Sequence, residues 1–103
     1  MRCRKCTPVP QEVRRLADLL ERRWTLSILY ASRGGAVRFN EFRQALGPVP
    51  PATLAVRLTE LAEAGLFERV VVDARPPLVE YRVTSRGRQL QEAVDVLVGG
   101  ALR

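Results

Sequence analysis

Two cysteines near the start of the chain, Cys3 and Cys6, have the clearest capacity for covalent chemistry. Their C-x-x-C spacing suits a local disulfide, half of a metal site or a redox centre. Arg2, Arg4 and Lys5 surround them with positive charge, which favours the reactive thiolate form. Two chains of a dimer can also supply four thiolates to one zinc ion. A thiol oxidoreductase normally has a βαβ context around this motif, and the sequence shows none.

The overall composition narrows the possible chemistry further. The chain has 103 residues and no histidine, which excludes Ser-His-Asp and Cys-His nucleophile pairs and most zinc and non-haem iron sites. We therefore predict that the protein is not an enzyme and uses no cofactor. The net charge of +6 suits a surface that binds DNA by counterion release. All but one of the 17 basic residues are arginine, a bias that the base composition of a genome can also produce.

Length and hydropathy predict one small domain. A content of 47% hydrophobic and 27% charged residues is typical of a globular core rather than of disorder. No apolar run approaches the ~18–20 residues that cross a bilayer, and no apolar stretch follows the basic N-terminus as in a signal peptide. We expect a cytoplasmic protein without a membrane partner, with a flexible basic arm over residues 1–9 and a single domain over residues 10–103.

The spacing of apolar residues predicts four helices in the first two thirds of the chain. The first covers residues 10–21, and the second runs from Trp24 to the Gly34-Gly35 pair. Asn40 or the residue before it caps a third helix that ends at Gly47. Pro51 begins a fourth helix that Gly65 closes, with its buried stripe formed by Leu54, Leu58 and Leu61.

A change of period then predicts a hairpin and a last helix. Residues 66–73 and 78–83 alternate as strands around the turn Ala74-Arg75-Pro76-Pro77, and Ala36-Val37-Arg38 is a short segment able to pair with them. Thr84 or Ser85 caps a helix that ends at Gly99-Gly100, with an apolar face of Leu90, Ala93, Val94 and Leu97. The fold class is α+β, mainly α: a winged helix-turn-helix with a two- to three-stranded β wing.

Four stretches resemble, in order, the motifs of the HxlR-type winged-helix transcriptional regulators of the MarR-like superfamily: RRWTLSIL, VRFNEFRQAL, LAVRLTELAEAGLFER and RPPLVEYRVTSRGRQL. The resemblance covers about residues 20–90. It implies a cytoplasmic, homodimeric DNA-binding regulator without a separate ligand domain, whose dimer contacts come from the first and last helices. Some members sense stress through a cysteine just ahead of the first helix, and Cys6-Thr7-Pro8 resembles that position.

The fourth helix is the expected recognition helix, and its buried stripe predicts which residues face outward: Ala52, Thr53, Ala55, Val56, Arg57 and Thr59. Thr53 can reach a phosphate or a base, Val56 a thymine methyl group, and Arg57 a guanine edge or a phosphate. The alternative for Arg57 is an ion pair with Glu60. Pro50, Pro51 and Ala52 replace the cap and polar residues usual in the family, which predicts modest sequence specificity or a different operator.

Arginines outside this helix are candidate phosphate contacts. Arg75 lies at the tip of the wing beside two prolines that stiffen it. Arg38 is either a phosphate contact or a partner of Glu41, and Arg86 can reach the DNA backbone from the start of the last helix. Glu80 is expected to pair with a nearby arginine, while Trp24, Phe39, Phe42 and Tyr81 are expected to pack in the core.

Two functional hypotheses follow. The first is a homodimeric regulator on a pseudo-palindromic operator, with a small-molecule effector unknown and the N-terminal cysteines as a candidate redox switch. The second is a winged-helix protein-interaction module, in which Ala52, Ala55 and Val56 dock a protein partner. Salt dependence separates them, because phosphate binding weakens steeply with salt and apolar docking does not.

Overall fold

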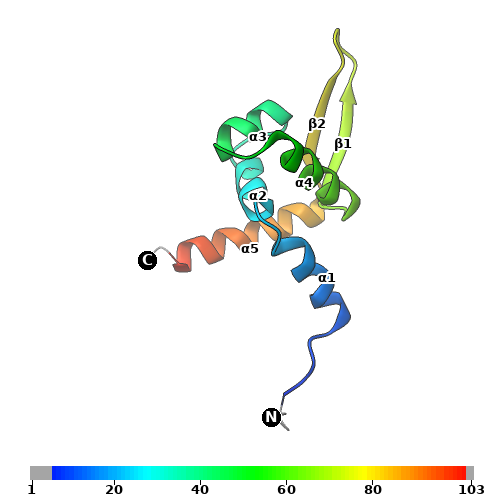
Figure 1. Ribbon diagram of the computed structural model, residues 1–103. Helices are drawn as coiled ribbons and strands as arrows, with labels where there is room; N and C mark the ends of the chain where they lie inside the picture. Colours follow the sequence, from blue (N-terminus) through cyan, green and yellow to red (C-terminus); the bar gives the residue numbers. More distant parts are fainter. Residues whose placement is uncertain (1–5, 102–103) are drawn as a thin grey trace.

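The computed structural model describes residues 6–101, which form five helices and one antiparallel hairpin (Figure 1). Cys3 therefore lies outside the described residues. The elements follow the predicted order along the chain: α1 (Gln11–Leu20), α2 (Thr25–Arg33), α3 (Phe39–Leu46), α4 (Pro51–Glu63), β1 (Phe67–Val72), β2 (Leu78–Val83) and α5 (Ser85–Ala101). The predicted fold class, mainly helical with a β wing, is confirmed.

The core lies where α2, α3 and α4 meet the base of the hairpin. Leu54, Leu58 and Leu61 are fully buried, as their spacing predicts. Phe42 of α3 and Phe67 of β1 pack beside them with ring centroids 6.0 Å apart. Further buried side chains complete this cluster: Ile28, Leu29, Val49 and Leu66. The partly buried side chains of Trp24, Phe39 and Tyr81 pack against its margin.

The wing is a two-stranded sheet with a short third contributor. Strands β1 and β2 pair in antiparallel register, with Phe67 opposite Val83 at one end and Val72 opposite Leu78 at the other. Arg38 forms an isolated bridge with Glu80, and the Tyr81 N–H donates to the Val37 carbonyl at 2.7 Å. The predicted pairing of the segment before α3 is therefore confirmed. The free end of the hairpin projects away from the helices (Figure 1).

Two helix boundaries differ in detail from the expectation. The N-cap of α3 is Arg38 rather than Asn40 or Phe39, because the Glu41 carboxylate, three residues on, accepts the N–H groups of Arg38 and Val37 at 2.8 and 3.1 Å. Thr84 caps α5 as predicted, its hydroxyl accepting the Gly87 N–H at 3.1 Å. Helix α5 continues through Gly99 and Gly100 to Ala101, so the predicted stop there is wrong.

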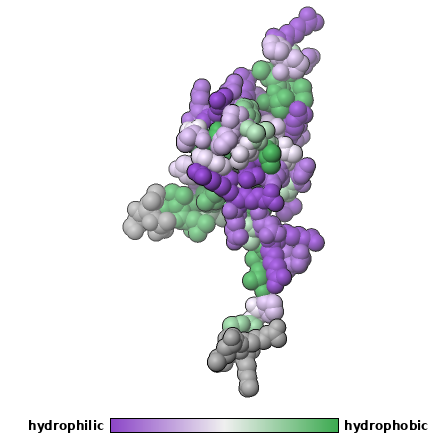
Figure 2. Space-filling model, in the orientation of Figure 1, coloured by the Kyte–Doolittle hydropathy of each residue, from purple (hydrophilic) through white to green (hydrophobic). Residues whose placement is uncertain are grey.

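Helices α1 and α5 extend from the body of the molecule in different directions (Figure 1). No residue of α1 is buried, and Val13 and Leu16 expose 50% and 43% of their surface. On α5, Val96 and Leu97 expose 75% and 66% of their surface. Leu97 lies only about 60° around the helix from the buried Val94, so it belongs to the predicted apolar face and is nevertheless exposed. Figure 2 shows apolar colour along both projecting segments. Across residues 6–101 no helix combines the length and hydropathy that a membrane span requires.

Candidate nucleic-acid interface

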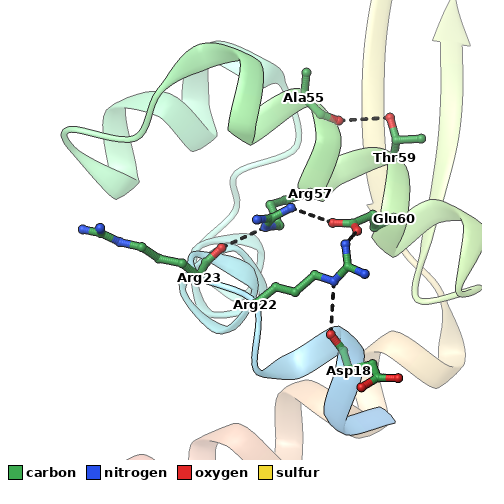
Figure 3. Close-up of polar contacts among 7 residues, drawn as sticks. All are labelled: Asp18, Arg22, Arg23, Ala55, Arg57, Thr59 and Glu60. Carbon is green, nitrogen blue, oxygen red and sulfur yellow. Dashed lines mark hydrogen bonds and ion pairs between the residues drawn. The ribbon is translucent and has the colours of Figure 1, made fainter. Parts of the chain in front are cut away.

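The exposed face of α4 is made of small, largely apolar side chains. Ala52, Ala55, Val56 and Thr59 are exposed as predicted, with Val56 at 50%. Thr53 is only half-buried rather than fully outward. The Thr59 hydroxyl donates to the Ala55 carbonyl at 3.0 Å, which satisfies that hydroxyl within the helix (Figure 3). This face can therefore offer methyl groups to a base edge more readily than hydrogen-bond donors.

Arg57 does not point outward, contrary to the expectation. Its side chain is 19% exposed, its Nε donates to the Arg23 carbonyl at 2.9 Å, and its Nη1 donates to Glu60 Oε1 at 2.9 Å (Figure 3). The alternative pairing with Glu60 is thus the one present in the structure. Arg57 lies three positions after Leu54, only about 60° from that buried residue around the helix, so it lies on the flank of α4.

Arg57, Glu60 and the Arg23 carbonyl form a polar cluster, which Arg22 joins from the turn between α1 and α2. Its guanidinium forms an ion pair with the second oxygen of Glu60, and its Nε donates to the Asp18 carbonyl at 3.2 Å (Figure 3). Sequence reasoning assigned no role to Arg22. Arg22 begins the RRWTLSIL stretch, but its partner Glu60 lies 38 residues away and no local pattern shows that contact.

At the base of the wing, Glu80 lies between two arginines. Arg82 donates to Glu80 Oε1 from Nη2 at 2.8 Å and from Nε at 3.0 Å, and Arg38 Nε lies 3.7 Å from Oε2. The expected arginine partner of Glu80 is confirmed. Arg38 pairs through its side chain with Glu80 and not with Glu41, since Glu41 is bonded to backbone N–H groups. About half of the Arg38 and Arg82 side-chain surface stays exposed, at 49% and 54%.

The electrostatics of Glu41 follow from the same geometry. The backbone N–H of Arg38, and then that of Val37, holds the pKa of the Glu41 carboxyl below its usual range. Hydrogen bonding to the charged form is the cause, because burial acts in the opposite direction. The negative carboxylate therefore remains at the N-terminus of α3, where the helix dipole also favours it.

The remaining candidate residues lie at two separate places. Arg75 is exposed at the tip of the wing, on the same hairpin as the exposed Arg69. Arg86 is exposed on the first turn of α5 but borders a groove beside α1, with Glu12 and Arg15 on its walls. The structure thus places the wing arginines to one side of α4, whereas Arg86 lies at the far end of that helix near Glu63.

The N-terminal thiol is accessible to solvent. Cys6 is exposed in the segment without regular structure that leads into α1. Between residues 6 and 101 no group of three or more His, Cys, Asp or Glu side chains is arranged to hold a metal ion. A zinc site shared by two chains would also require Cys3, which lies outside the described residues.

Comparison with known proteins places these features in a family. The model of HxlR-like helix-turn-helix proteins matches residues 19–100. The chain is 42% identical over 88 residues to Rv3095 of Mycobacterium tuberculosis, which is called an uncharacterized HTH-type transcriptional regulator. The aligned segment covers 85% of this chain and 55% of the relative. It is 39% identical over 75 residues to YtfH of Escherichia coli, covering 73% of this chain and 60% of that one. The chain thus spans little more than half the length of these relatives.

Two solved structures share the fold closely. The reduced form of the transcriptional regulator YodB from B. subtilis superposes with a TM-score of 0.79 at 28% identity, over 91% of this chain and 92% of that one. The redox regulator HypR in its oxidized form superposes with a TM-score of 0.77 at 32% identity, over 85% of this chain and 91% of that one.

Proposed function

Because this chain belongs to the HxlR-like helix-turn-helix family, we propose that it is a DNA-binding transcriptional regulator that acts as a homodimer on a pseudo-palindromic operator. The observation that carries this proposal is the position of α4. Its buried leucine stripe holds it against the core, and its exposed face lies beside a projecting hairpin. Such an arrangement suits a helix in the major groove and a wing along the neighbouring backbone. The protein would work where the chromosome lies, in the cytoplasm.

The proposed DNA contacts divide into two kinds. Val56, at the centre of the exposed face of α4, meets a thymine methyl group, and Thr53 reaches a phosphate at its edge. Arg75 and Arg38 contact phosphates from the wing tip and the wing base, and Arg86 does so from α5. Arg57 can contact DNA only by giving up its bonds to Glu60 and to the Arg23 carbonyl.

The proposed dimer is built from the two projecting helices. Val13 and Leu16 of α1 and Val96 and Leu97 of α5 expose apolar surface that a second copy would remove from water. A two-fold axis through these helices would set the two α4 helices about 34 Å apart, one turn of DNA. The dimer thereby explains why α5 extends beyond the core.

A finer proposal concerns regulation through Cys6. The exposed thiol lies just before α1, and two of the similar structures are described as a redox regulator and a diamide-treated protein. Hydrogen peroxide would oxidise Cys6 and a second cysteine, of the same or the neighbouring chain, to a disulfide. Two thiols then lose two hydrogens, and the peroxide leaves as two molecules of water. The new bond would shift α1 and with it the dimer.

The apolar character of the α4 face favours one rival function. Ala52, Ala55 and Val56 offer no hydrogen-bond donor from their side chains, and Glu63 is exposed on the same helix. A protein partner with an apolar docking surface would also suit such a face. In that case binding would depend little on salt.

Fluorescence anisotropy with labelled duplex DNA tests the proposal. The titration uses random-sequence duplex at low and at moderate salt, with reduced protein and with peroxide-treated protein. Tight binding that weakens steeply with salt is expected, and its loss on oxidation should be absent in Cys3→Ser and Cys6→Ser variants. If the reduced protein binds no DNA at low salt, the regulator function is wrong and the interaction module stands.

A further inference from the structure

The turn between α1 and α2 carries two adjacent arginines whose side chains have different surroundings. Arg22 is engaged by Glu60 and by the Asp18 carbonyl. The Arg23 guanidinium instead lies over the Trp24 ring, 4.9 Å from its centroid, and extends away from the cluster (Figure 3). Within residues 6–101 its nitrogens form no hydrogen bond or ion pair. An arginine stacked on an aromatic ring keeps its in-plane N–H groups free for a planar or tetrahedral oxyanion.

This turn is attached to α4 by two arginine contacts. The Arg23 carbonyl accepts the Arg57 Nε at 2.9 Å, and Arg22 pairs with Glu60, so both residues of α4 hold the turn. Arg57 also donates to Glu60, which closes the cluster. Trp24 has a positive φ of 81°, which directs the chain from the turn into α2. These contacts therefore hold the backbone of Arg23 against α4.

The turn and the wing lie on opposite flanks of α4. Glu60 faces the turn, whereas Ala62, about 200° away around the helix, borders a groove shared with Phe67 and Arg69 of β1. A major groove is about 12 Å wide and has a phosphate backbone on each side. With α4 in that groove, the wing would lie over one backbone and the turn would face the other.

We propose that Arg23 is a DNA phosphate-binding residue on the flank of α4 opposite the wing. The cluster has the two guanidiniums of Arg22 and Arg57 against the single carboxylate of Glu60, and the Arg23 guanidinium over Trp24 adds a third positive charge beside it. Arg22 and Arg57 fix the turn, and Arg23 donates its in-plane N–H groups to a phosphodiester oxygen. The inference rests on the proposed function, because the phosphate belongs to the DNA that α4 binds.

The experiment compares Arg23→Gln with Arg14→Gln, which removes the same charge from an exposed residue of α1. Affinity for random duplex DNA is measured by anisotropy over a series of salt concentrations. Arg23→Gln should weaken binding for all sequences alike and reduce the slope of log K against log salt by about 1 for each contacted phosphate. Arg14→Gln should keep the wild-type slope, and Arg23→Lys should restore most of it.

The outcomes separate this inference from the proposed function. If the wild-type protein binds DNA and Arg23→Gln has the same salt slope as Arg14→Gln, Arg23 is not a phosphate contact and only this inference is overturned. If the wild-type protein binds no DNA, the proposed function itself is overturned. Arg23 contributes its carbonyl, not its side chain, to the cluster, so both glutamine variants should melt with the wild-type protein; circular dichroism checks this.

Discussion

Arg57 Nη1 lies 2.9 Å from Glu60 Oε1, and this contact holds the one arginine of α4 on the flank of that helix. The side chain is 19% exposed, and a second bond ties it to the backbone of the α1–α2 turn. Arg57 thus connects α4 to the turn that follows α1. Removal of the Arg57 side chain should therefore lower the free energy of unfolding.

Arg57→Ala should lower the free energy of unfolding by about 1–2 kcal/mol, because a charge-assisted hydrogen bond is lost and the Arg23 carbonyl loses its partner. Urea denaturation measures the change. Arg43→Ala, an exposed position on α3, should stay within about 0.5 kcal/mol of the wild-type protein. Equal stability of Arg57→Ala and wild-type protein would contradict a structural role and leave Arg57 free for DNA.

Gly87→Ala should strongly destabilise the protein although alanine favours helices. A Cβ at this position would lie 2.2 Å from the Leu66 carbonyl oxygen and 2.6 Å from Val83 Cγ2, so the start of α5 would have to move off the wing. Gly99→Ala on the same helix meets nothing within 4 Å and should be neutral or stabilising by up to about 1 kcal/mol. Thermal unfolding of the two variants tests this contrast, and similar melting temperatures would refute it.

The contribution of Glu41 to the free energy of unfolding should be lost in acid. Backbone N–H groups of Arg38 and Val37 lower the pKa of the Glu41 carboxyl in the folded protein relative to the unfolded chain. A carboxyl whose pKa is lowered on folding contributes stability at any pH above its pKa in the unfolded chain, which is about 4.3 for glutamate. That contribution is lost as the pH falls through its pKa in the folded protein. The stability difference between wild-type protein and Glu41→Gln, from urea titrations at neutral and acid pH, should therefore shrink in acid. A difference that is independent of pH would argue against the backbone hydrogen bonds.

Leu97→Asp should weaken the proposed dimer without unfolding the chain, since 66% of the Leu97 surface is exposed. A carboxylate buried in an apolar interface lacks a compensating partner, so the dimer dissociation constant should rise at least about tenfold. Sedimentation velocity over a range of concentrations measures it. Gln89→Asp makes the same charge change on the exposed first half of α5 and should leave the dimer intact. An unchanged constant for Leu97→Asp would place the interface elsewhere.

Much of the fold could be predicted because its signals are local. Pro51 and Gly65 mark the limits of α4, and the spacing of Leu54, Leu58 and Leu61 identifies its buried face, all within one segment. The hairpin is equally visible in its alternating residues and its Pro76-Pro77 turn. The sequence misled at the end of α5, where Gly99 and Gly100 do not stop the helix. Periodicity placed Leu97 on the same face as the buried Val94 but could not show that Leu97 stays exposed.

The sequence by itself determined the element order, the buried face of α4 and the position of the wing, because hydrophobic period, caps and turn residues act over a few neighbouring positions. Only the tertiary structure decided which charges meet. Glu60 lies beside Arg22 and Glu80 beside Arg38, pairs separated by 38 and 42 residues. Such pairs depend on the angles at which packed elements cross, and a side chain such as Arg57 turns toward the partner that this packing brings within hydrogen-bond distance.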